Sequence, residues 1–152
     1  PYFYADIVCV ARKGTPQASA TGISQLTGTG TAQDGTVWYN EFLDQMPGIE
    51  KVSAVETATA MIMAVAESKV DFVCTDLPTA MGACATYDNL VILNFTGTAD
   101  NFNASEGDIN IGISVKKGNT GLADMMDAVL GNMTNEDFND LMNQAIAIQP
   151  EI

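Results

Sequence analysis

The chain has 152 residues, enough for one ordinary domain with a substantial buried core. Its formal net charge is −13, from 6 basic and 19 acidic residues, which argues against nucleic acid or an anionic membrane as a partner. The sequence contains no histidine, which removes the commonest general base, the Ser-His triads and most zinc sites. We therefore expect no metal, no cofactor and no nucleic-acid partner.

The ends and the cysteines add little about location. No run of about 18 apolar residues is present, so no membrane-spanning segment is expected. The chain opens at Pro1-Tyr2-Phe3-Tyr4 without a start methionine, and we interpret it as part of a longer protein. Cys9, Cys74 and Cys84 lack metal-binding spacing and are expected to be small buried hydrophobic residues.

The first half of the chain has the signals of short strands and helical turns. Residues 6–12 alternate and are rich in β-formers, which is typical of a strand. The other elements expected here are a helical turn over 23–26, strands over 28–33 and 52–54, and a helix over 36–46. The segment 28–33 is only weakly strand-like, and it is assigned as a strand because the beginning of a helix follows it directly.

The second half begins with the strongest helix, over 56–68, which has one apolar stripe at helical spacing. The elements expected after it are strands over 71–75, 90–93 and 109–115, a helix over 79–86, a polar loop over 95–108, and two C-terminal helices. Each terminal helix has an apolar face, formed by Leu122, Met125, Met126, Val129 and Leu130 in one and by Phe138, Leu141, Met142, Ala145 and Ile146 in the other. Thr134 with Asp137 approximates a capping box, and Gln149-Pro150 are expected to end the last helix.

Strands and helices alternate through the middle of the chain, which argues for parallel pairing and a sheet covered by helices. The predicted fold class is α/β. It has three layers, with a mostly parallel sheet of about five strands and helices on both faces, followed by the two C-terminal helices.

Two predicted strand ends carry complementary chemistry. At Gln33-Asp34-Gly35-Thr36 a strand passes into the beginning of a helix, where free backbone N–H groups and a partial positive charge suit a carboxylate. The apolar strand over 71–75 is followed by Asp76, whose carboxylate suits an ammonium group. If both ends face one crevice at the carboxyl edge of the sheet, the site fits a zwitterion.

These motifs resemble those of the second, C-terminal lobe of type II solute-binding proteins, which bind amino acids for ABC importers. The motifs that carry the resemblance, in the family's order, are Gln33-Asp34-Gly35-Thr36, the helix and turn over 61–71, Asp76-Leu77-Pro78-Thr79-Ala80, and the stretch 111–119, which reads Ile-Gly-Ile-Ser-Val-Lys-Lys-Gly-Asn. The resemblance covers the chain from about residue 4 to residue 150, and the motifs together are more specific than any one of them.

By position, the resemblance implies that Gly35, Thr36 and the Val37 N–H hold the ligand α-carboxylate and that Asp76 holds the α-ammonium, with Gln33 lining the pocket. Two plainer interpretations stay open. Thr36 can be an ordinary helix start, and Asp76 can cap the helix that begins near Pro78, which is compatible with binding. Asp71, by the same resemblance, is expected to cap or position its strand.

The resemblance also implies parts that this sequence does not contain. In the family the first lobe supplies an arginine that grips the carboxylate, and the sole arginine, Arg12, does not match it. We expect residues 1–118 to form the solute-binding lobe and residues 119–152 to form helices that pack towards the missing first lobe. Without that lobe, we expect binding that is millimolar or weaker and an exposed apolar surface, with a homodimer of the fragment left open.

The expected function is capture of an amino acid outside the cytoplasm, in the periplasm or at the cell surface on a membrane-tethered parent protein, and its delivery to an ABC transporter permease. This role needs no catalytic residue. One alternative is a ligand-sensing domain of a signalling or LysR-type regulatory protein, because these share the two-lobe plan. A less favoured alternative is an enzyme resembling cyclohexadienyl dehydratase, with Glu41 or Glu56 as acidic candidates that lack an organised partner in the sequence.

Overall fold

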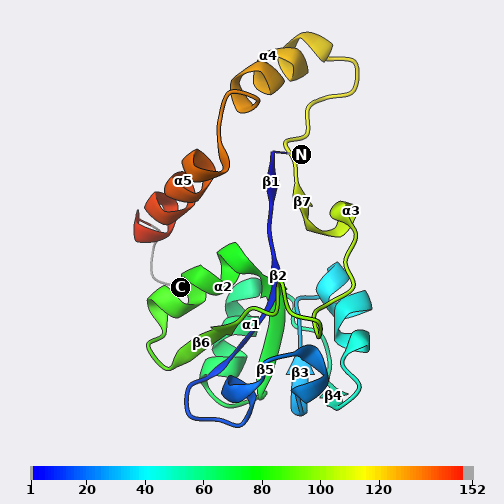
Figure 1. Ribbon diagram of the computed structural model, residues 1–152, viewed down its shortest axis with the longest axis vertical. Coiled ribbons are helices and arrows are strands. Elements are labelled where there is room, and N and C mark those ends of the chain that lie inside the picture. Colours follow the sequence, from blue (N-terminus) through cyan, green and yellow to red (C-terminus); the bar gives the residue numbers. More distant parts are fainter. Residues whose placement is uncertain (1, 149–152) are drawn as a thin grey trace.

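The computed structural model describes residues 2–148 and contains a lobe built on a five-stranded sheet, with a helical arm above it (Figure 1). The strand order is β4-β3-β5-β2-β6. The strands are β2 (Ile7–Arg12), β3 (Gly28–Thr31), β4 (Ile49–Lys51), β5 (Phe72–Asp76) and β6 (Leu90–Leu93). The predicted α/β fold with about five strands is therefore confirmed.

Strand β2 is the exception to the common direction of the sheet. β3 pairs in parallel with β4 and β5, whereas β2 pairs antiparallel with both β5 and β6. The connection from β2 to β3 contains only the short 3-10 helices η1 (Gln17–Ser19) and η2 (Ile23–Gln25). β5 lies between β2 and β3 and runs parallel to β3, so β2 runs in the direction opposite to both.

Helices on both faces cover the sheet, as predicted. α1 (Ala58–Ala66) contacts β2 and β5, and α2 (Leu77–Thr86) contacts β2, β5 and β6. In the strand order, the connections from β4 to β5 through α1 and from β5 to β6 through α2 both run towards β6. The connection from β3 to β4 runs the opposite way. Right-handed crossovers therefore place α1 and α2 on one face and the connection after β3 on the opposite face.

The core lies between these layers. Side chains of β2 and β5 form its centre, and Val8, Cys9, Val10, Phe72, Val73 and Cys74 are fully buried. Met61, Ile62 and Val65 on α1 cover one side. Burial of such side chains is the main favourable contribution to folding, at roughly 25 cal/mol per Å² of apolar surface.

The helix predicted over 36–46 forms, but it is not an α-helix. The segment folds as the π-helix η3 (Trp38–Phe42), followed directly by the 3-10 helix η4 (Leu43–Gln45). Phe42 and Leu43, at the junction, are both buried.

Three other boundaries differ from the prediction. The strand predicted over 52–54 is wrong, because the edge strand β4 lies three residues earlier, where it pairs with β3. The strand predicted over 109–115 is reduced to β7 (Asn110–Ile111), because its partner β1 (Phe3–Tyr4) has only two residues. The loop predicted over 95–108 ends in the short helix α3 (Glu106–Ile109).

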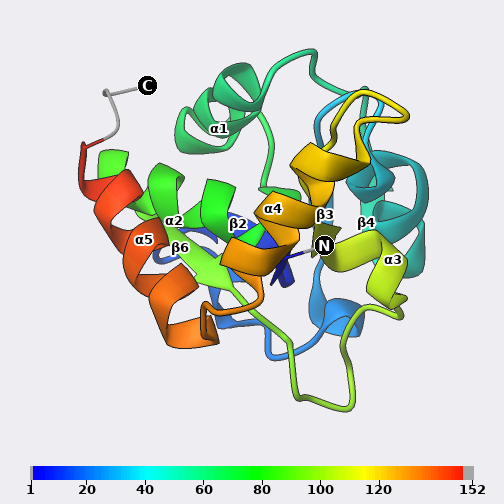
Figure 2. The same ribbon diagram turned by 90° about the horizontal axis from the view of Figure 1, so that it is seen from above.

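The helical arm leaves the lobe through the β1–β7 ribbon. It contains α4 (Thr120–Leu130) and α5 (Asn135–Ile148), which confirms that two helices follow the lobe. In both views α5 lies beside α2, and these helices are in contact (Figures 1 and 2). The predicted helix end at Gln149-Pro150 lies outside the described residues, and within residues 2–148 no helix is long and apolar enough to cross a membrane.

Candidate functional site

Parallel pairing of β3 with β5 places two of the predicted site segments at the same edge of the sheet. Thr31 at the end of β3 lies opposite Val73 in β5, so both strands run towards this carboxyl edge. The turn over 33–37 follows β3, and Asp76 is the last residue of β5. The element that follows the turn, η3, contacts β5. In open α/β sheets, this edge is where ligands bind.

The turn after β3 is held in shape by its own hydrogen bonds. Gly35 has φ of +72°, a conformation that favours glycine, and its N–H donates to Asp34 Oδ1 at 2.9 Å. The Thr36 hydroxyl donates to the Gln33 carbonyl at 2.6 Å and accepts from the Tyr39 amide at 3.4 Å. Thr36 is thus part of a helix start, as the plainer interpretation of the sequence has it.

Two backbone donors of this turn have no acceptor in the described part of the chain. The amides of Thr36 and Val37 donate to no protein group there, whereas the Gly35 amide is occupied by Asp34. Gln33 forms an isolated parallel bridge with Val55, and its side-chain amide donates to the Glu56 carbonyl at 3.4 Å. Its side chain is therefore tied to the neighbouring loop.

Asp76 is the N-cap of α2. Its Oδ1 accepts from the Thr79 amide at 2.8 Å, and its Oδ2 accepts from the Thr79 hydroxyl at 3.0 Å. Pro78 stands in the first turn of α2, where its missing N–H costs no hydrogen bond. The capping role expected as an alternative is confirmed. A carboxylate offers about four lone-pair positions, so these two bonds leave acceptor capacity on the half-buried side chain.

An ion pair between the end of β2 and the residue before β5 lies at the opposite edge of the sheet. Asp71 Oδ2 accepts from the Thr29 amide at 2.7 Å and from the Thr29 hydroxyl at 2.9 Å, so Asp71 positions the beginning of β5, as expected. Arg12 Nη2 lies 3.6 Å from Asp71 Oδ1, and Arg12 Nη1 donates to the carbonyls of Val65 and Val70. Arg12 is therefore structural and far from Asp76 along the sheet.

The structure adds two polar residues to this edge that sequence reasoning missed. Asn94, just after β6, donates to Asp6 Oδ2 at 2.9 Å, and the Asp6 carbonyl accepts from the Leu77 amide at 2.9 Å. Asp6 precedes β2, and only the antiparallel direction of β2 brings it to the carboxyl edge of β5. A parallel assignment of β2 would place it at the other edge.

A small cavity of about 140 Å³ lies beside Asp6, and Asn101 is part of its lining. Asn101 Oδ1 is buried and has no hydrogen-bond partner among residues 2–148. A cavity of this size has room for ordered water, which commonly satisfies such an atom.

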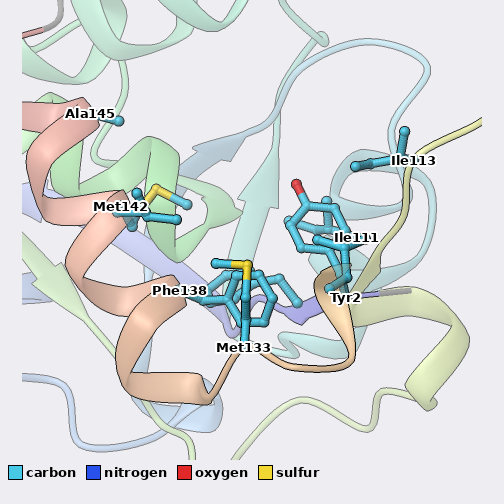
Figure 3. Close-up of a pocket in the computed structure, with 10 residues that line it drawn as sticks. Tyr2, Ile111, Ile113, Met133, Phe138, Met142 and Ala145 are labelled. Atoms are coloured by element: carbon cyan, nitrogen blue, oxygen red, sulfur yellow. The ribbon is translucent and has the colours of Figure 1, made fainter. Parts of the chain in front are cut away.

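A larger, apolar cavity of about 310 Å³ lies between the β1–β7 ribbon and the arm (Figure 3). Figure 3 shows Tyr2, Met133, Phe138 and Met142 converging on it. The Tyr2 and Phe138 rings pack with centroids 5.5 Å apart. None of the five predicted ligand-binding residues lines this cavity, and its chemistry suits packing of apolar side chains more than binding of a zwitterion.

Acidic groups that could serve catalysis or metal binding are dispersed. Glu41 and Glu56 are exposed, and neither carboxylate has a hydrogen-bond or ion-pair partner in the described chain. No group of three or more His, Cys, Asp or Glu side chains within residues 2–148 is arranged to hold a metal ion.

The fold is shared with part of several amino-acid ABC transporter substrate-binding proteins of known structure. No protein-family model and no curated protein matches the sequence. Among solved structures, an arginine-bound truncated form of ArgBP from T. maritima is 27% identical with a TM-score of 0.65, over 88% of this chain and 58% of that one. AbpA from Streptococcus pneumoniae, an amino acid ABC transporter substrate-binding protein bound to L-arginine, is 21% identical with a TM-score of 0.71, over 97% of this chain and 59% of that one.

A third similar structure is the ancestral amino-acid-binding protein AncCDT-1, described as a precursor of cyclohexadienyl dehydratase, with 18% identity and a TM-score of 0.68 over 95% of this chain and 59% of that one. The chain therefore spans about three fifths of the length of these proteins. The resemblance stated from the motifs is confirmed at the level of the fold, and it covers a lobe-like part of the neighbours.

Proposed function

We propose that this chain is the second lobe of an extracytoplasmic amino-acid-binding protein that delivers its ligand to an ABC transporter permease. The observation that carries the proposal is the position of the 33–37 turn and Asp76 at one edge of the sheet, in a fold shared with amino-acid-binding proteins. Binding of this kind involves no chemical step, so no residue is assigned a catalytic role.

The α-carboxylate binds at the turn. Gly35 gives the backbone its left-handed bend, and the amides of Thr36 and Val37 are the donors without a protein acceptor in the described chain. Two N–H groups aimed at one carboxylate form charge-assisted hydrogen bonds, which are about twice as strong as neutral ones. The hydroxyl of Thr36 is engaged with Gln33, so its contribution is to hold the turn rather than to donate to the ligand.

The α-ammonium binds at Asp76. The carboxylate is already oriented by Thr79, so little side-chain entropy is lost when it accepts a further hydrogen bond. Gln33 lies beside the turn and contributes to the pocket wall. The ligand therefore lies between the ends of β3 and β5, with its side chain directed away from this lobe.

A first lobe of the same protein closes the site from the other side. We propose that residues 1–118 are the solute-binding lobe and that the helices in residues 119–152 pack towards that first lobe. The apolar lining of the cavity between the arm and the β1–β7 ribbon supports an arrangement in which more protein covers this region. Location in the periplasm or at the cell surface, with a membrane tether on the parent protein, belongs to the same proposal.

The test is a titration of the isotope-labelled chain with a panel of L-amino acids, followed by amide NMR. We expect saturable shifts at Thr36, Val37 and Thr79 with a dissociation constant in the millimolar range or weaker, because one lobe alone cannot exclude water. Asp76→Asn removes the charge but keeps an oxygen that can cap α2, since Asn and Asp cap almost equally well. This variant should lose at least about tenfold in affinity, the loss of a charge-assisted hydrogen bond of 1.5–3 kcal/mol.

The matched control is Asp88→Asn, which removes the same charge at an exposed position outside the site. It should bind like the wild type. N-acetylated amino acids, which lack the ammonium, should bind wild type and Asp76→Asn equally weakly. Absence of saturable shifts at the 33–37 turn, or equal affinity of Asp76→Asn and Asp88→Asn for free amino acids, would contradict the proposed site.

A further inference from the structure

Two of the three cysteines face one another across the centre of the sheet. Cys9 in β2 and Cys74 in β5 are direct register partners in an antiparallel pair. Directly opposed residues of antiparallel strands project to the same face of a sheet. Both side chains are 0% exposed, and both thiols are reduced in the structure. Cys84, the third cysteine, lies on α2 and is half-buried.

The hydrogen-bond pattern assigns this pair to the closer of the two antiparallel geometries. The Leu77 amide donates to the Asp6 carbonyl at 2.9 Å, so residues 6 and 77 form a hydrogen-bonded pair that extends the β2–β5 register by one step. Hydrogen-bonded and non-hydrogen-bonded pairs alternate along such a ladder. Three steps further, Cys9 and Cys74 form a non-hydrogen-bonded pair.

The other neighbour of β2 gives the same result independently. The Lys13 amide donates to the Asn89 carbonyl at 2.8 Å, and alternation from that pair makes Cys9 and Leu93 a hydrogen-bonded pair. The backbone groups of Cys9 therefore point towards β6 and away from Cys74. Non-hydrogen-bonded pairs have Cα atoms about 4.5 Å apart, which lies inside the range of about 4.4–6.8 Å spanned by disulfides.

We propose that Cys9 and Cys74 are a cross-strand disulfide site, closed by thiol–disulfide exchange with a low-molecular-weight disulfide or a disulfide oxidoreductase while the chain folds. One cysteine, as thiolate, attacks a sulfur of the oxidant, forms a mixed disulfide and releases the first oxidant thiol. The second cysteine attacks the mixed disulfide and releases the second oxidant thiol. The two cysteines are oxidised by two electrons, the oxidant disulfide is reduced to two thiols, and the two cysteine protons pass to the released thiolates.

Burial decides when the bond can form. In the folded chain the pKa of Cys74 is raised well above its usual value. The main cause is burial away from water, and the neighbouring Cys9 thiol is the second cause. The thiolate is the attacking species, and no oxidant reaches a side chain that is fully covered. Exchange is therefore confined to the period before the helices close over the sheet. An extracytoplasmic location, as proposed above, supplies the oxidising environment, although the pairing geometry does not depend on that proposal.

The bond would enclose the segment from 9 to 74, which contains β3, β4 and α1 together with the 33–37 turn. It would also join β2 and β5 two residues before Asp76. The cross-link would thus restrain the two strands that position the carboxyl edge.

The test is oxidative refolding of the reduced, unfolded chain in a mixture of reduced and oxidised glutathione. The product is then unfolded without reductant, alkylated, and analysed as intact protein and by peptide mapping. We expect a monomer whose mass before alkylation is lower by about 2 Da, the loss of two hydrogens, with alkylation at Cys84 alone and a linked peptide pair containing Cys9 and Cys74. Alkylation of all three cysteines, or a linkage that includes Cys84, would overturn the proposal.

Cys84→Ala is the matched variant, because it removes the only competing partner and leaves the sheet unchanged. It should form the same linkage and retain no alkylated cysteine. Cys9→Ala and Cys74→Ala should each retain two alkylated cysteines under the same conditions. The wild-type peptide map decides the question even if a core variant fails to fold, and a calorimetric or NMR result on amino-acid binding has no bearing on it.

Discussion

The lobe and the arm of this molecule use the same apolar residue types in opposite ways. In the lobe, the strands β2 and β5 bury almost every side chain, and Val8, Val10 and Val73 are 0% exposed. In the arm, α4 and α5 contain no buried residue, and Met125 and Val129 are 65% and 64% exposed. A periodic apolar pattern predicts a helix in both regions, but only the helix of the lobe, α1, buries its apolar side chains within the described chain.

The difference shows that an amphipathic pattern determines which side of a helix is apolar. Whether that side is buried depends on a second element that packs against it. The stripe on α1 meets β2 and β5, which are present in the chain. The stripe on α4 has no comparable surface to cover it within residues 2–148. The first lobe proposed above is the surface that would cover this stripe.

The largest expected difference in stability between the two regions comes from removing one phenylalanine ring from each. Phe72→Ala in β5 leaves a cavity in a fully buried site and should lower the free energy of unfolding by about 3–5 kcal/mol. Phe138→Ala in α5 removes a half-buried ring that contacts Tyr2 and Phe3, and should cost about 1 kcal/mol. Urea unfolding followed by fluorescence of Trp38, the only tryptophan, measures the stability of the lobe. Equal losses in the two variants would break the comparison.

One added methyl group should have smaller effects on stability, and these effects should have opposite signs in the lobe and in the arm. In Gly30→Ala, the new Cβ would overlap the Phe72 ring, so the tightly packed sheet should lose about 1–3 kcal/mol. In Gly121→Ala, the new Cβ meets open space near the beginning of α4, and the helix should gain about 0.5–1 kcal/mol. Thermal unfolding by circular dichroism gives both signs. A stabilising Gly30→Ala would show that β3 is not packed as described.

The smallest effect concerns acidification of the arm. Hydrogen bonds from the Thr134 amide and then the Thr134 hydroxyl hold the pKa of Asp137 below its ordinary value. Because the folded pKa lies below the unfolded one, the carboxylate stabilises the start of α5 above the ordinary carboxyl range. This contribution is lost as the pH falls through the folded pKa. Helical ellipticity should therefore fall on acidification more in the wild type than in Asp137→Asn, and identical pH profiles would contradict the capping role.

The sequence predicted well those elements whose local residue pattern agrees with where the fold needs them. The strand over 90–93 is found at Leu90–Leu93 without a shift, because its ends coincide with turn signals and its apolar run is short. The capping box at Thr134 and Asp137 is confirmed by a bond of 2.7 Å from the Thr134 amide to the carboxylate. Both features depend on residues that are close together in the chain.

The parts that were missed depend on partners distant in the sequence. The edge strand β4 is placed by pairing with the glycine-rich β3, and Glu50 and Lys51 carry little strand preference of their own. The antiparallel direction of β2 could not be predicted from local pattern either. The position of Asp6 at the carboxyl edge of β5 follows from that direction and was missed with it. For the site itself, the cap at Asp76 was one of the interpretations left open by its position before Pro78, and it is confirmed. Ligand binding by Asp76 and the 33–37 turn stays a prediction.

The two-residue ribbon of β1 and β7 has a consequence for protein engineering. Phe3 lies opposite Ile111 and Tyr4 opposite Asn110, so the chain enters and leaves the lobe at neighbouring points. Segments with adjacent ends are the ones that tolerate insertion into a host loop, because the host need not be pulled apart to receive them. The segment between these strands therefore has the geometry needed for insertion into another protein, at a loop as short as that of a β-hairpin.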